Sequence, residues 1–131
     1  MRYKPKRRRL TLEERRIVHA KCGGHCAYCG TLIEFKRMQV DHVESIEMGG
    51  VDTIDNMLPS CRSCNHYKSS SPLYSFRRAI EAWPDVLMRD SITYRNAVRF
   101  GMVEPKPHAV VFYFEKEEEH TCNNAHVAEN C

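Results

Sequence analysis

Two pairs of cysteines constrain the fold of this chain more than any other feature. Cys26 and Cys29 form one Cys-x-x-Cys pair, Cys61 and Cys64 form a second, and 31 residues separate the two pairs. Each spacing lets one tight turn present two sulfurs to the same ion, and two such turns complete a tetrahedron. We therefore predict a structural zinc ion that joins the two turns. Because all four ligands are sulfur, no coordination position remains for a reacting water.

The composition supports a metal site rather than disulfide bonds. Of the 131 residues, 42% are hydrophobic and 28% are charged, as in an ordinary globular domain. The sequence contains no run of ~18 apolar residues that could span a membrane, and no apolar stretch follows the basic N-terminus as in a secretory signal. We therefore expect a cytoplasmic protein without a membrane partner, in which cysteines stay reduced and bind metal.

The two ends of the chain carry opposite charge, which the net charge of +3 conceals. Residues 1–9 contain six basic side chains and no acidic one, whereas residues 115–131 contain five acidic side chains and one lysine. We expect residues 1–10 to form a flexible basic arm and residues 115–131 a mobile acidic tail. Charge alone does not decide whether the arm binds a polyanion or is simply solvated.

The pattern of capping and apolar residues predicts an α+β fold. Thr11 and Glu14 have the spacing of a capping box, so a helix should begin at Thr11 and end at Gly23–Gly24. The other elements that we expect are strands over 37–43 and 57–60, a helix that begins near Ser63, a helix that begins at Ser71–Pro72, a helix over about 85–100 and a strand-like segment over 109–114.

The segment between the cysteine pairs contains a second recognisable pattern. In order along the chain it has Asp41-His42, Gly49-Gly50, Asn56, Asn65 directly after the last cysteine, and Lys68. Over residues 25–70 this pattern resembles the His-Asn-His (HNH) endonuclease family. The third signature position in that family is often histidine, so the chain resembles a His-Asn-Asn variant, with His66 as the rival one residue later.

The resemblance implies a small ββα-metal nuclease core, held together by the four-cysteine zinc site, within a nuclease domain over residues 11–114. The expected activity is hydrolysis of DNA phosphodiester bonds, by nicking or by double-strand cleavage, in a bacterial or phage-infected host cell. His42 would be the general base, and Asp41 and Asn65 would be ligands of a catalytic Mg²⁺ or Mn²⁺. Asn56 would fix the loop around His42. An imidazole suits proton abstraction near neutral pH, and hard oxygens suit those cations.

Several basic residues are candidates for contacts with nucleic acid. Lys68 should share a helical face with Asn65, close to the positive end of the helix dipole, where a phosphate is favoured. The other candidates are Arg37, Arg62, Arg7, Arg8 and Arg9. Asp41 and His42 would point to opposite faces of a regular strand, so the strand must end, twist or bulge there if both are to serve one phosphate.

Two other classes of function remain open at this point. One is a zinc-stabilised nucleic-acid-binding module without catalysis, and the other is a protein-interaction module that uses residues 76–114 and the acidic tail. A single active site cuts one strand, so a homodimer or another protein partner is a further possibility. Cys22 could replace one zinc ligand, and His120, Cys122, His126 and Cys131 in the tail remain without an assigned role.

Overall fold

The structure is a computed structural model that describes residues 7–116. The predictions for the first part of the basic arm and for most of the acidic tail therefore lie outside the described residues. The contacts divide the chain into two compact units, one of Met1–Leu73 with Val111–Cys131 and one of Tyr74–Val110. The domain predicted over residues 11–114 thus contains a sheet-bearing unit and a helical unit.

The first helix of the sheet-bearing unit, α1, spans Leu12–Ala20 and begins as the sequence predicts. The Thr11 hydroxyl accepts a hydrogen bond from the backbone N–H of Glu14, and the Glu14 carboxylate accepts one from the N–H of Thr11, both at 3.1 Å. These two bonds satisfy amides that no turn of the helix can reach. Val18 is fully buried and places this helix on the core.

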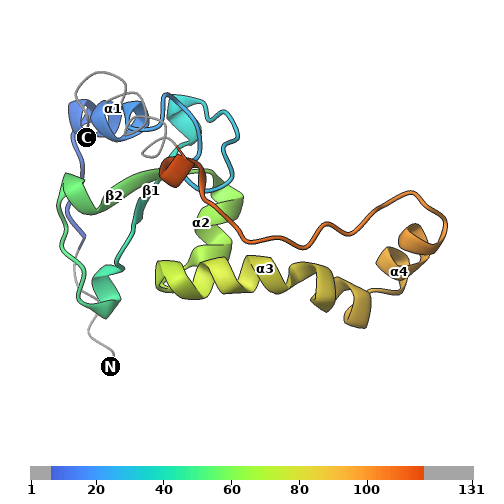
Figure 1. The fold of residues 1–131 in the computed structure, drawn as a ribbon. Helices are drawn as coiled ribbons and strands as arrows, with labels where there is room; N and C mark the ends of the chain where they lie inside the picture. The colour runs from blue at the N-terminus through green and yellow to red at the C-terminus, as the bar shows by residue number, and fades with distance from the viewer. Residues whose placement is uncertain (1–6, 117–131) are drawn as a thin grey trace, which may run out of the picture. The chain divides into compact units, whose positions relative to one another are not determined.

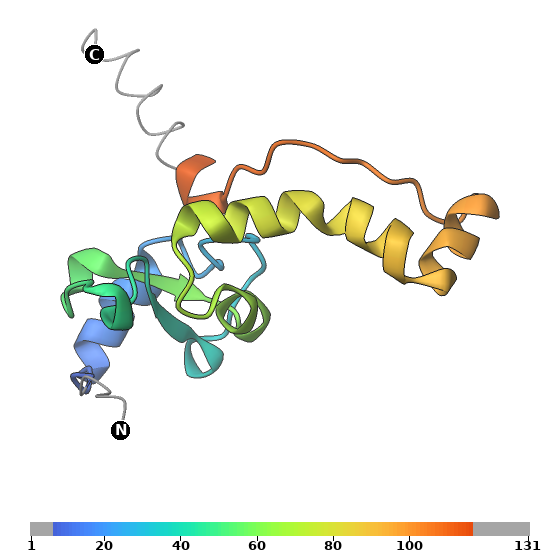
Figure 2. The same ribbon diagram turned by 90° about the horizontal axis from the view of Figure 1, so that it is seen from below.

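Two short strands and one helix form the centre of this unit. Strand β1 (Gln39–His42) runs antiparallel to β2 (Met57–Ser60), with Gln39 opposite Ser60 and His42 opposite Met57. Helix α2 (Arg62–Lys68) follows β2 directly and contacts β1, whereas α1 contacts β2 (Figure 1). Figure 2 shows the same strand–strand–helix arrangement from below. Both predicted strands and the α+β class are confirmed.

Three short 3₁₀ helices lie in the connections of this unit. η1 (Phe35–Arg37) precedes β1, and η2 (Ile46–Met48) and η3 (Ile54–Asn56) lie between β1 and β2. The last of them leads directly into β2, because η3 ends at Asn56 and β2 begins at Met57. The loop between the strands therefore contains two short helical segments, and the second of them ends where β2 begins.

The helical unit differs from the prediction in where its helices break. Helix α3 (Leu73–Asp90) continues through Pro84, and α4 spans Ile92–Arg99. The helix predicted over about 85–100 is therefore wrong, because the break falls at Ser91. The Ser91 hydroxyl accepts a hydrogen bond from the N–H of Tyr94 at 3.1 Å, which is the usual N-cap interaction. None of the described helices is long and apolar enough to cross a membrane.

The strand-like segment predicted over 109–114 is also wrong. Residues 107–112 have no regular secondary structure, and residues 113–116 are helical. The backbone N–H groups of Tyr113 and Phe114 donate to the carbonyls of Tyr28 and Ala27, at 3.1 and 2.9 Å. Phe112 is buried and makes an edge-to-face contact with Tyr28, with 5.2 Å between the ring centroids. The apolar side chains that suggested a strand instead cover the first cysteine turn.

Candidate active site and metal centre

The four predicted cysteines lie together in the sheet-bearing unit. All four Sγ atoms are within 4.8 Å of one another, and Sγ of Cys29 is 3.9 Å from Sγ of Cys61. Ligand sulfurs about 2.3 Å from a tetrahedral zinc ion are ~3.8 Å apart, so the cluster has the size of a metal site. Cys22 is buried but is not part of the cluster.

Backbone hydrogen bonds hold the two cysteine turns in place. The N–H of Ala27 donates to the carbonyl of Pro59 at 2.8 Å and so ties the first turn to β2. Cys61 is the N-cap of α2, and its sulfur accepts a hydrogen bond from the N–H of Cys64 at 3.4 Å. The strand–helix junction therefore positions both sulfurs of the second pair.

The surroundings of the cluster favour negatively charged sulfur at Cys26. A hydrogen bond from the Cys64 thiol lowers the pKa of Cys26 to about 4, and the amides of Cys61, Cys29 and Tyr28 also lower it, against the opposing effect of burial. The same sulfur–sulfur hydrogen bond raises the pKa of Cys64. A thiolate is the form that binds metal, and the backbone N–H groups aimed at the sulfur of Cys26 stabilise that form.

Asp41 lies in a buried ionic cluster rather than in open solvent. It is 5% exposed, and its Oδ2 atom is 3.0 Å from Nζ of Lys68 and accepts a hydrogen bond from the hydroxyl of Tyr28. Burial and the neighbouring Asp41 carboxylate raise the pKa of Tyr28, which keeps the phenol protonated as a donor. Among the described residues, both of these contacts use Oδ2, which leaves Oδ1 as the oxygen available to a cation.

Lys68 does not take the position expected of a lysine that binds a phosphate. Its side chain is 0% exposed, and Nζ also donates to the backbone carbonyl of His42 at 3.1 Å. The last turn of α2 faces β1, so the ammonium group reaches the strand instead of the surface. The structure therefore assigns Lys68 to holding the Asp41–His42 segment, and the expected phosphate contact is corrected.

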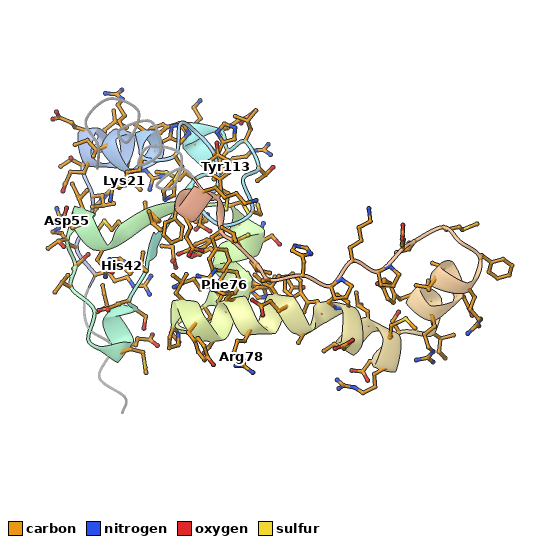
Figure 3. All side chains as sticks on the ribbon, in the orientation of Figure 1. Lys21, His42, Asp55, Phe76, Arg78 and Tyr113 are labelled. Atoms are coloured by element: carbon orange, nitrogen blue, oxygen red, sulfur yellow. The ribbon has the colours of Figure 1, made fainter. Side chains whose placement is uncertain are left out.

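His42 is the last residue of β1 (Figure 3). Its side chain is buried, with 9% exposed. Its Nε2 atom is 2.9 Å from Oδ1 of Asp52, a residue of the loop between the strands. Asp41 and His42 thus contact different partners, as consecutive residues of a strand do. Asp52 is not among the residues predicted from the sequence, because one acidic residue among several in a loop gives no signal before the loop is folded.

Asn56 fixes the loop that carries Asp52. Its side-chain oxygen accepts a hydrogen bond from the N–H of Glu44 at 2.9 Å, and its amide nitrogen donates to the carbonyls of Glu44 and Val51, both at 2.8 Å. One side chain therefore joins the residues just after β1 to those just before Asp52. This contact closes the loop on itself, next to His42.

The two glycines of this loop are needed for different reasons. Gly49 has a φ angle of +95°, which side-chain-bearing residues rarely adopt. At Gly50 the restriction is space, because an added Cβ would lie 1.9 Å from the backbone oxygen of Glu44. Gly49 therefore allows an unusual backbone angle, whereas Gly50 permits close approach of two backbone segments.

A pocket of about 270 Å³ brings the predicted catalytic residues together. Asp41, His42 and Asn65 all line it, and so does the rival residue His66. The remaining lining residues are Arg7, Val40, Ser45, Glu47, Ser69 and Ser70. Two carboxylates, one carboxamide and two imidazoles thus line one polar space.

The predicted basic residues are distributed over two further pockets. Arg37 and Arg62 line one of about 600 Å³ beside Cys61, together with Gln39 and residues 32–34. Arg7, Arg8 and Arg9 line another of about 490 Å³, which His42 also lines. The described part of the basic arm therefore lies next to His42, whereas Arg37 and Arg62 lie next to the cysteine cluster.

Comparison with known proteins agrees with this arrangement. The model of the family described as HNH endonuclease matches residues 26–71, which include the four cysteines, both strands and α2. The central part of the chain is therefore similar to the HNH endonuclease family, and the matched segment covers about a third of the chain.

Two relatives are Cas9 proteins. The CRISPR-associated endonuclease Cas9 of Corynebacterium diphtheriae is 38% identical over 48 residues, which are 36% of this chain and 4% of that protein. The solved type II-C Cas9 enzyme from Actinomyces naeslundii is 26% identical, with a TM-score of 0.46, over 56% of this chain and 8% of that one. The chain thus spans a small fraction of the length of either relative.

Proposed function

We propose that this protein is a cytoplasmic endonuclease that hydrolyses DNA phosphodiester bonds with the help of Mg²⁺ or Mn²⁺. The observation that carries the proposal is that Asp41, His42 and Asn65 line one polar pocket within the segment that matches the HNH family. A nuclease needs a base for water and a cation for the phosphate, and this pocket offers residues suited to both.

Asp41 and Asn65 would hold the catalytic cation. Both offer hard oxygen atoms, which Mg²⁺ and Mn²⁺ prefer, and the Oδ1 atom of Asp41 is the one not used by Lys68 or Tyr28 among the described contacts. When bound, the cation would stabilise negative charge on the phosphate and on the departing 3′ oxygen. His66, which lines the same pocket, is the alternative to Asn65.

His42 would take a proton from the attacking water. Its Nε2 atom faces Asp52, and Nδ1 has no hydrogen-bond partner among the described residues. A neutral imidazole with one nitrogen engaged as a donor leaves the other nitrogen as an acceptor. Lys68 would contribute indirectly, because its ammonium group holds both the Asp41 carboxylate and the carbonyl of His42.

The cysteine cluster would hold zinc and stabilise the fold. Four sulfurs within 4.8 Å of one another suit a soft, tetrahedral ligand set rather than Mg²⁺. Arg7, Arg8 and Arg9, beside His42, and Arg37 and Arg62, beside the cluster, would contact the DNA backbone. One active site cuts one strand, so two copies of the chain would have to cooperate to produce linear plasmid in the same assay.

Nicking of supercoiled plasmid in a Mg²⁺ titration, with EDTA as the control, tests the proposal. His42→Ala should lose about 10²-fold or more in rate at every Mg²⁺ concentration, because His42 is not a proposed ligand. Asp41→Ala and Asn65→Ala should weaken metal dependence itself and regain part of the rate at high Mn²⁺. His66→Ala should be milder than Asn65→Ala.

The outcomes separate the enzyme from the alternatives. A wild-type protein that binds DNA but never nicks it would favour the zinc-stabilised binding module. A His42→Ala protein that cuts at the wild-type rate would reject the catalytic assignment. Near-complete loss in His66→Ala, with little effect in Asn65→Ala, would move the ligand by one residue.

A further inference from the structure

We propose that Asp52 is a positioning residue for His42, and that the same carboxylate joins the basic arm to the active site. The proposal rests on the function proposed above, in which His42 is the base. Oδ1 of Asp52 lies 2.9 Å from Nε2 of His42, and Oδ2 accepts a hydrogen bond from the backbone N–H of Arg8 at 2.7 Å. One side chain thus has one oxygen on the base and the other on the arm.

The contact with His42 selects one form of the imidazole. An ionised carboxylate can only accept hydrogen bonds, so Nε2 of His42 must carry the hydrogen. The hydrogen bond from the Arg8 backbone and the one from His42 hold the pKa of Asp52 below its usual range, which keeps the carboxylate ionised. The lone pair of the neutral ring is then on Nδ1, the nitrogen that would accept the proton of the attacking water.

The contact with Arg8 places the arm. Asp52 accepts a hydrogen bond from the backbone N–H of Arg8, so this contact does not engage the guanidinium group of that residue. The guanidinium group of Arg8 is 2.6 Å from the carboxylate of Glu14, the residue that closes the capping box of α1. Asp52 and Glu14 thus hold Arg8 from two sides, and its neighbours Arg7 and Arg9 line the pocket beside His42.

These two contacts predict two separable kinetic effects. Loss of the bond to His42 should lower kcat, because fewer imidazoles would have the productive tautomer. Loss of the bond to Arg8 should raise KM for DNA, because the arm would no longer be held next to the pocket. If Asp52 had only a structural role in the loop, its substitution would lower the stability of the protein without changing the tautomer of His42.

The test compares Asp52→Asn with Asp52→Glu and with Asp55→Asn in the full-length, zinc-loaded protein. Asp55 is an exposed carboxylate in the same loop and serves as the matched control. Asp52→Asn should lower kcat for plasmid nicking about 10- to 100-fold, which is typical when the group that orients a functional histidine is removed. Its half-saturating Mg²⁺ concentration should stay unchanged. Asp52→Glu should restore part of the rate, and Asp55→Asn should match wild type.

The direct readout is the tautomer of His42, from ¹⁵N–¹H correlation spectra recorded where the imidazole is neutral, with His42→Ala used to assign the signal. Wild type should show hydrogen on Nε2, and Asp52→Asn should show a mixture of tautomers or the Nδ1 form. An unchanged tautomer with an unchanged kcat would overturn the proposal. If the wild-type protein does not cut DNA, the proposed function fails while the spectra still decide the role of Asp52.

The link to the arm is tested by deleting residues 2–9. The deletion should raise KM and leave kcat nearly unchanged. Combined with Asp52→Asn, it should add no further increase in KM beyond that of the deletion alone, because both changes remove the same contact. A further, independent increase in KM in the combined variant would show that Asp52 does not act through the arm.

Discussion

The sheet-bearing unit and the helical unit are stabilised in different ways. With the single exception of Phe76, the buried apolar residues of the described chain lie in the sheet-bearing unit, which also contains the cysteine cluster and the buried ion pair of Asp41 and Lys68. The helical unit instead exposes many large apolar side chains, among them Trp83, Ile92, Phe100 and Met102. An ion pair of this unit, between Arg89 and Asp90, is exposed.

This difference indicates where a single substitution can do damage. The interactions of the sheet-bearing unit join residues far apart in the sequence, such as Cys29 with Cys61 and Asp41 with Lys68. The interactions of the helical unit are mostly local, since α3 and α4 depend on their own turns and on the Ser91 cap. Removal of one partner should therefore disrupt the first unit strongly and the second weakly.

The largest effect is expected from Cys61→Ser. The substitution removes a ligand and also weakens the sulfur cap of α2, so zinc should be lost together with the fold of the sheet-bearing unit. Elemental analysis and circular dichroism would measure both. Cys22→Ser is the matched control, because Cys22 is buried outside the cluster, and this variant should retain one zinc ion per chain. A folded, zinc-free Cys61→Ser protein would contradict the assigned site.

The next effect concerns the buried ion pair. Lys68→Met keeps most of the side-chain volume but leaves the Asp41 carboxylate buried without its cation, which should lower the free energy of unfolding by about 3–5 kcal/mol. Urea denaturation of the zinc-loaded protein would measure the change. If Lys68→Met has the same free energy of unfolding as wild type, the ion pair between Lys68 and Asp41 does not stabilise the fold.

A smaller and more local effect should follow from Gly50→Ala. Its Cβ would meet the backbone oxygen of Glu44, which cannot rotate away, so the loop between the strands must shift and move Asp52 with it. Nicking activity should fall at least 10-fold. Gly49→Ala has free space around the added Cβ and only its positive φ as a cost, so it should retain more activity and lose about 1–2 kcal/mol of stability. Equal losses in both variants would show that space at Gly50 is not the restriction.

The sequence predicted the parts of this molecule that depend on spacing. The spacing of the two cysteine pairs predicted the metal cluster, and the capping box predicted the start of α1. The alternation of apolar residues predicted both strands. The orientation of Lys68 could not be predicted in that way. The sequence places Lys68 in the helix that follows β2. Which face of that helix packs against β1 depends on tertiary packing, and the sequence does not show it.

The same limit applies to Asp52 and to residues 109–114. A hydrogen bond between His42 and Asp52 needs a loop closed by Asn56 and Gly50, which spacing along the chain does not show. Residues 109–114 have the composition of a strand, yet their aromatic side chains cover Tyr28 and no sheet edge is paired there. The apolar composition of this segment correctly indicates that Phe112 is buried, but the strand that it also suggests does not form.

The smallest effect is expected in the helical unit, from Asp90→Asn. The Arg89 side chain lowers the pKa of Asp90, so the pair contributes stability above the usual pKa of an aspartate and loses it as the pH falls through the lowered value. Both side chains are well exposed, at 70% and 58%, so solvent screens most of this contribution. The thermal midpoints of Asp90→Asn and wild type should therefore coincide at pH 7 and fall together toward pH 3. A midpoint for Asp90→Asn well below that of wild type at pH 7, with the difference vanishing in acid, would show that local charge contributes more to this unit than its exposure indicates.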